Sequence, residues 1–196
     1  MQLQSKLNPK IAGLNIALFK ALGFLSLFLL LTFPSQSHGE LLFLKSDEFK
    51  FSWPLPSEWE ETQSLTKGQY ALKLKGDKLM TLVLFISTED KMTLPVMLNL
   101  HSQNPQWLFG GIKARFPEST FISSAVVKIG SHDAVQTQME YTVKNLDSSI
   151  TIYACHHTTI WRGLMFSLCF ECLPENRVEG LKHLQAALVG FSFSGP

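Results

Sequence analysis

Hydrophobic and polar residues alternate along much of the chain. Between positions 134 and 144, Val135, Met139, Tyr141 and Val143 are separated by polar residues, which is typical of a β-strand with one buried face. Similar strand-like runs, most of them bounded by short polar turns, cover residues 41–44, 49–51, 70–74, 79–86, 121–129, 150–158, 164–170 and 191–193, while the proline-containing residues 53–57 predict a turn. The pattern therefore predicts an antiparallel β-sheet.

Helical periodicity appears in the middle and at the end of the chain. Pro95 and Pro105 each stand where a first helical turn is expected, and Leu108, Ile112 and Phe116 then fall on one helical face. A last helix is predicted after Pro174, ending at Gly190, with an apolar side made of Val178, Leu181, Leu184 and Leu188. Strands interrupted by helices predict an α+β fold, with helices packed on the antiparallel sheet.

The first 37 residues have the three regions of a secretory signal peptide. Residues 1–20 contain three lysines and no carboxylate, residues 21–33 carry no charge, and Ser35 and Ser37 precede His38. We expect cleavage before His38 or Glu40, which leaves one globular domain over residues 40–194 in an exported protein, periplasmic or secreted. The alternative is an uncleaved signal anchor, which would be the protein's only contact with a membrane.

Composition excludes several functional classes. The 45% apolar share and the 15 phenylalanines exclude a disordered chain. Without the three lysines of residues 1–20, the chain has 14 basic side chains against 16 acidic ones. A nucleic-acid binder that neutralises phosphates is not expected from this charge balance.

Both ends of the globular segment resemble one known family. Residues 49–59 (FKFSWPLPSEW) run from aromatic residues through prolines to a tryptophan, and the last predicted helix leads into residues 190–193 (GFSF). These features resemble PsbP-like domains, and the order of elements over residues 40–194 resembles the αβα sandwich shared by PsbP and a Ran-binding nuclear import factor. The resemblance implies this fold and a non-catalytic accessory role. We therefore expect an exported binding or assembly module with a protein partner and no cofactor.

Three cysteines, Cys155, Cys169 and Cys172, lie in the segment expected to be exported, where two of them should pair. A hairpin centred on Arg162 would place Cys155 opposite Cys169, whereas a shift of one residue would point these two thiols to opposite faces. Cys169 and Cys172 are the least expected pair, because an extended chain separates their α-carbons by about 10 Å. The sequence predicts one disulfide from Cys155 to Cys169 or Cys172.

The same region also suggests a metal-binding or thiol-redox protein. Cys169 and Cys172 have the C-x-x-C spacing, and Cys155, His156 and His157 could supply metal ligands. Neighbouring residues on a strand point to opposite faces, however, so the two histidines cannot both reach one ion without a bulge. A structural role for the three cysteines is favoured over metal binding or redox chemistry. A metal site at Cys155, His156 and His157 is the alternative.

An extracytoplasmic enzyme is the other alternative. His132 and Asp133 invite comparison with a hydrolase, but no G-x-S-x-G motif accompanies them, and their place between two strands predicts solvated turn residues. Gly110 and Gly111 precede a lysine without the spacing of a phosphate-binding loop. We expect these glycines to allow a helix to approach the sheet closely.

Trp161 and Arg162 are the candidate partner-binding residues. They occupy the tip of the predicted hairpin, where an apolar side chain has little to pack against. Exposed tryptophan and arginine are enriched at binding hot spots. The other interpretation is that Trp161 folds back over the edge of the sheet.

Overall fold

The computed structural model describes residues 42–62, 66–89, 91–145 and 148–194. Within these ranges no helix is long and apolar enough to cross a membrane. The predicted signal segment, residues 1–37, lies outside the described residues.

The larger of two sheets contains the strands predicted in the second half of the chain. Its strands are β3 (Trp59–Thr62), β4 (Gln69–Leu74), β5 (Asp77–Thr88), β6 (Thr120–Ile129), β7 (His132–Asn145), β8 (Ser148–Trp161) and β9 (Leu164–Cys172). They pair antiparallel in the order β3-β4-β5-β9-β8-β7-β6. Val135 and Met139 are buried on β7, as its alternating pattern predicts. The predicted antiparallel sheet is confirmed.

A smaller sheet corrects the prediction for the start of the globular segment. It has the order β1-β2-β10 and consists of β1 (Leu42–Ser46), β2 (Phe51–Leu55) and β10 (Ser192–Phe193). Residues 53–55 belong to a strand and not to a turn, because Phe51, Trp53 and Leu55 alternate toward the core and are fully buried. Pro54 is tolerated there since β10 pairs only with the first two residues of β2.

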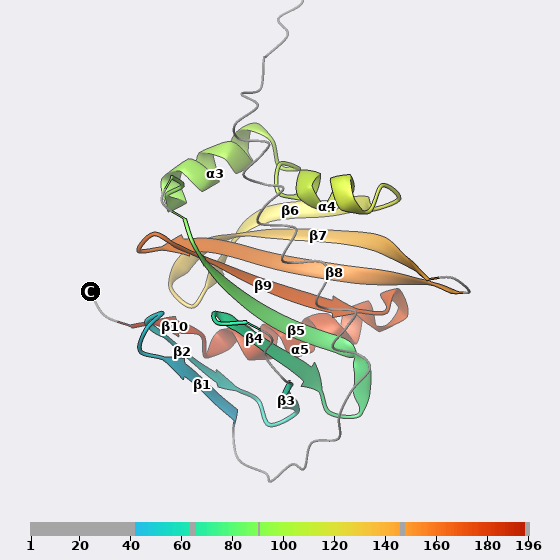
Figure 1. Ribbon diagram of the computed structural model, residues 1–196, viewed down its shortest axis with the longest axis horizontal. Helices are drawn as coiled ribbons and strands as arrows, with labels where there is room; N and C mark the ends of the chain where they lie inside the picture. The colour runs from blue at the N-terminus through green and yellow to red at the C-terminus, as the bar shows by residue number, and fades with distance from the viewer. Residues whose placement is uncertain (1–41, 63–65, 90, 146–147, 195–196) are drawn as a thin grey trace, which may run out of the picture.

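The helices complete an αβα arrangement, which confirms the α+β fold class. They are α3 (Leu94–Gln103), α4 (Phe109–Arg115) and α5 (Arg177–Val189), the last preceded by a 3₁₀ turn, η2 (Pro174–Asn176). Figure 1 shows α3 and α4 on one side of the larger sheet, and α5 with the smaller sheet on the other. Each face of the larger sheet therefore has its own hydrophobic core.

Aromatic side chains hold the smaller sheet against α5 and the larger sheet. The rings of Phe51 and Phe191 stack with 5.7 Å between their centroids, and Phe166 of β9 packs edge-on against Phe51 at 6.2 Å. The indole Nε1 of Trp53 donates a hydrogen bond to the carbonyl of Ala187 on α5, at 2.7 Å. The buried tryptophan thus satisfies its polar atom while it joins β2 to α5.

The buried face of α5 includes Leu181, Leu184 and Leu188, as predicted, but not Val178. Gly180, Leu184 and Ala187 are buried, whereas Val178 is 73% exposed. A Cβ at position 180 would lie 2.6 Å from the Phe170 ring, so the helix can approach β9 this closely only with glycine there. The sequence predicted the close approach at Gly110 and Gly111, but a Cβ at position 110 would meet nothing within 4 Å.

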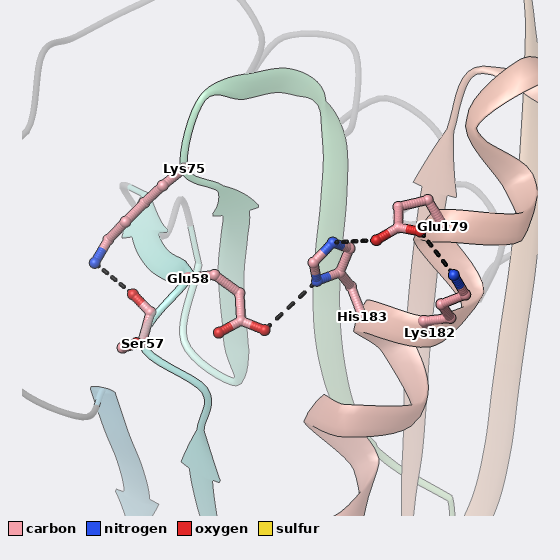
Figure 2. Close-up of polar contacts among 6 residues, drawn as sticks. All are labelled: Ser57, Glu58, Lys75, Glu179, Lys182 and His183. Atoms are coloured by element: carbon pink, nitrogen blue, oxygen red, sulfur yellow. Dashed lines mark hydrogen bonds and ion pairs between the residues drawn. The ribbon is translucent and has the colours of Figure 1, made fainter.

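Polar contacts on the surface also connect α5 with the loop between β2 and β3 (Figure 2). His183 lies between two carboxylates, with Nδ1 3.5 Å from Glu58 and Nε2 3.6 Å from Glu179. The Lys182 ammonium, 3.0 Å from Glu179, lowers the pKa of that carboxyl group. Because Glu58, Glu179 and Lys182 are exposed to solvent and His183 is partly so, we assign these contacts a minor part in stability.

Candidate partner-binding site

The tip of the β8–β9 hairpin has the geometry of a tight two-residue turn. Trp161 ends β8, Leu164 begins β9, and Arg162 and Gly163 form the turn with φ values of 53° and 72°. Positive φ at both central residues is the type I′ geometry, which favours Asn-Gly or Gly-Gly sequences. Arg162 therefore occupies a left-handed conformation that is unfavourable for a side chain of its size.

Aromatic rings from three separate elements meet behind this turn. Trp161 stacks on Phe193 of β10 with 5.1 Å between ring centroids. His132, the first residue of β7, packs edge-on against Phe193 at 4.5 Å and against Trp161 at 6.3 Å. The Arg162 guanidinium lies over the Trp161 ring, 4.8 Å from its centroid, which is a cation–π arrangement. We call His132, Trp161, Arg162 and Phe193 the tip cluster.

The tip cluster is open to solvent. Arg162 is exposed, and the three rings are partly exposed. Trp161 folds back onto Phe193 at the edge of the molecule and stays partly accessible. The prediction for His132 as a solvated turn residue is wrong, because its ring packs against two aromatic side chains. Sequence reasoning missed Phe193, whose place in the last predicted strand gave no signal of this contact.

His132 and Asp133 do not form the pair that a hydrolase would need. Asp133 makes an ion pair with Lys128 at 2.7 Å, and the Nδ1 of His132 lies 3.2 Å from the Ser131 hydroxyl. Side chains of adjacent residues on β7 also point to opposite faces of the sheet. This geometry gives no support to the enzyme alternative.

The three cysteines are free and buried. The hairpin turn lies where it was predicted, but the register differs from the predicted one, with Cys155 facing Phe170 and Cys169 facing His156. Cys155 and Cys172 therefore lie in the core shared with α5, while Cys169 lies in the core shared with α3 and α4. The predicted pairing of Cys155 with Cys169 is wrong because the two thiols occupy opposite faces of the sheet.

Burial makes these thiols poor nucleophiles. It raises the pKa of Cys155 and of Cys172 to about 12 each, and it also raises the pKa of Cys169. A reactive cysteine requires the thiolate, which burial in apolar surroundings suppresses. These environments do not favour the thiol-redox alternative.

The two neighbouring histidines of β8 are buried on opposite faces. Desolvation lowers the pKa of His156 and of His157 to about 4 each, so both rings are neutral near pH 7. The Nε2 of His157 lies 3.0 Å from the Gln136 side-chain amide. Cys155 shares a face with His157 and not with His156, so the predicted metal site at these three residues is not assembled. Among the described residues, no group of three or more His, Cys, Asp or Glu side chains could hold a metal ion.

A polar network fixes the start of α5 to the sheet. The Gln138 Oε1 accepts hydrogen bonds from the Tyr153 hydroxyl at 2.9 Å and from Arg177 at 3.0 Å. Arg177 also lies over the Tyr153 ring, 4.8 Å from its centroid. Sequence reasoning missed this network, which joins residues far apart in the chain and has a structural role in docking α5.

Comparison with known proteins shows similarity of fold. No protein-family model and no curated protein matches the chain. The solution structure of cyanobacterial PsbP (CyanoP) from Synechocystis matches 83% of this chain and 97% of its own, with a TM-score of 0.55 and 11% identity. The Ran-binding protein Mog1p of Saccharomyces cerevisiae matches 80% of this chain and 96% of its own, with a TM-score of 0.50 and 8% identity.

A third match is a protein from Bacteroides thetaiotaomicron, with a TM-score of 0.50 and 12% identity. It covers 74% of this chain, which spans 46% of the length of that protein. At these identities the matches establish the fold alone. The chain therefore has the fold shared by PsbP and Mog1p, as its sequence resemblance implied.

Proposed function

We propose that this chain is an exported, non-catalytic binding module that holds a protein partner at the tip cluster. The observation that carries the proposal is the placement of Arg162, which is exposed in a left-handed turn and stacked on Trp161. Strained backbone is retained where the surrounding structure enforces it, and such positions cluster at functional sites. Tryptophan and arginine are also the residues that most often dominate binding energy at protein interfaces.

The fold supports a binding role without specifying the partner. Mog1p is described as a Ran-binding protein, so a protein of this fold can bind another protein. For this chain we propose the same kind of activity, with a different and unidentified partner. Export is proposed from the N-terminal sequence alone, with the globular module over residues 40–194.

The proposal is tested by affinity purification of the tagged, full-length chain from the cells that make it. Trp161→Ala removes the central ring of the tip cluster, and we expect it to reduce the recovered partner by tenfold or more, as loss of about 2 kcal/mol at a hot spot would. The matched control is Trp107→Ala, since Trp107 is also partly exposed but lies between α3 and α4. If the Trp161→Ala variant is folded and recovers as much partner as the wild-type chain does, the proposal is contradicted.

A further inference from the structure

Three exposed cations near the tip cluster have no ion pair or side-chain hydrogen bond with any residue that the structure describes. Six other lysines form ion pairs with carboxylates: Lys45, Lys67, Lys73, Lys128, Lys144 and Lys182. Lys75 and Lys113 donate hydrogen bonds to backbone carbonyl groups. Lys50, Lys91 and Arg162 are exposed and form neither kind of contact with any residue that the structure describes.

These three residues border the same end of the molecule. The carbonyl of Lys50 accepts a hydrogen bond from Ser194, next to Phe193 of the tip cluster. Lys91 follows Glu89 closely in the chain, and the Glu89 amide donates to the carbonyl of Gly163 in the hairpin turn, at 2.7 Å. In Figure 1 the β1–β2 turn, β10 and the β8–β9 tip lie together at the left end of the view.

Two of the three cations also occupy unfavourable backbone positions. Lys50 and Arg162, with φ values of 55° and 53°, are the residues other than glycine that have positive φ in the described ranges. Glycine or asparagine would fit both turns with less strain. A charged side chain at both strained positions, next to one aromatic cluster, supports a role for the charges themselves.

The carboxylates that the structure describes close to the tip cluster do not cancel this charge. Asp47, Glu48 and Asp133 are already engaged by lysines, and Glu89 is only 7% exposed. Within the described residues, the tip therefore presents positive charge and partly exposed rings, although the chain after residue 37 has more acidic than basic side chains. Surfaces of opposite charge steer protein partners together and suppress wrong ones.

We propose that the tip cluster, with Lys50 and Lys91, binds an acidic segment of its protein partner, in which carboxylates flank an aromatic or apolar side chain. The carboxylates would pair with the three cations, and the apolar side chain would contact Trp161 and Phe193. Three separated cations around a small group of rings fit a short acidic segment better than the continuous basic stripe that nucleic acid requires. This inference rests on the proposed function, because it describes the partner of the same site.

The test measures binding of defined probes to the isotope-labelled chain by changes in amide chemical shift. The supporting probe is a short glutamate-rich peptide with one central phenylalanine, and the matched control peptide has lysine in place of glutamate. We expect only the acidic peptide to shift the signals of His132, Trp161, Arg162 and Phe193. Its affinity should fall as the salt concentration rises from about 0.05 to about 0.3 M, because salt screens the charges.

Charge reversal identifies the residues responsible. Lys50→Glu combined with Arg162→Glu should weaken binding of the acidic peptide tenfold or more. Lys75→Glu, at the opposite end of β5, should leave it unchanged. The inference is wrong if the acidic peptide causes no shifts, if the lysine peptide binds equally well, or if only phosphatidylserine vesicles or a single-stranded oligonucleotide shift these signals.

The same charge-reversed chain separates this inference from the proposed function. If affinity purification recovers the partner with Lys50→Glu/Arg162→Glu but loses it with Trp161→Ala, the tip cluster is a binding site whose partner is not acidic. The inference then fails, while the proposed function stands. If all three substitutions leave the partner bound, both are wrong.

Discussion

Arg162 combines an unfavourable backbone conformation with an exposed position over Trp161. Replacing it with asparagine creates the Asn-Gly sequence that type I′ turns favour. We therefore predict that Arg162→Asn raises the free energy of unfolding by about 1 kcal/mol, measured by urea denaturation, because the left-handed conformation costs less for asparagine. Arg162→Ala, which keeps the strain, should give no such gain. Reduced stability in Arg162→Asn would show that the contact with Trp161 outweighs the backbone strain.

His156 and His157 make stability depend on pH. Each has a pKa of about 4 in the folded protein, whereas an unfolded histidine titrates near 6.5. Between these values the unfolded state binds more protons, so stability falls as the pH is lowered from 6.5 toward 4. Within this window, each histidine should lower the free energy of unfolding by about 1.4 kcal/mol for each unit by which the pH falls.

Urea denaturation at a series of pH values measures this dependence. We predict that His156→Gln and His157→Gln each reduce its slope below pH 6.5, and that the double substitution reduces it further. An unchanged slope in both single variants would mean that these rings become protonated without unfolding.

Single residues also mark the limit of sequence-based prediction. The sequence located the β8–β9 turn at Arg162, but the exact pairing decides which thiols share a face, and it differs from the predicted pairing by one residue. Trp161 and Arg162 could be identified from their residue types and their place at the tip. His132 and Phe193 could not, because their contact depends on bringing β7 and β10 together across the fold.

At the scale of elements, the docking of α5 on β9 depends on Gly180. Alanine would favour the helix by about 1 kcal/mol, yet its Cβ would lie 2.6 Å from the buried ring of Phe170. We predict that Gly180→Ala lowers the free energy of unfolding by about 1–3 kcal/mol, as overpacking of a core does. Gly110→Ala on α4 is the control, and it should raise stability slightly because nothing lies within 4 Å. A stabilised Gly180→Ala variant would contradict this account of the interface.

Elements with a strong repeating pattern were predicted well. The strands from residue 121 to residue 170 alternate clearly and are joined by short turns, and the structure contains them as β6 to β9. The segment at β2 was misjudged because its prolines outweighed the alternation of Phe51, Trp53 and Leu55. On α5, Leu181, Leu184 and Leu188 face the core as predicted. The contribution of Gly180 and Ala187 to this buried face was missed because small residues carry little hydrophobic signal.

At the scale of the whole molecule, the proposed export predicts where the mature chain begins. We predict that the exported protein begins at His38 or Glu40, because small residues precede each site after the apolar segment. Intact-mass measurement of protein recovered from outside the cytoplasm decides between these ends. A chain that retains residues 1–37 would instead support the signal-anchor alternative.

The central claim, that the tip cluster holds a protein partner, is tested most directly by site-specific photo-crosslinking in the cells that make the protein. A photoreactive phenylalanine derivative replaces Arg162 in one variant and Val178, which is exposed on α5, in the other. We predict that position 162 yields a discrete crosslinked product with one other protein and that position 178 does not. Crosslinking from position 178 alone, or from neither position, would contradict the claim.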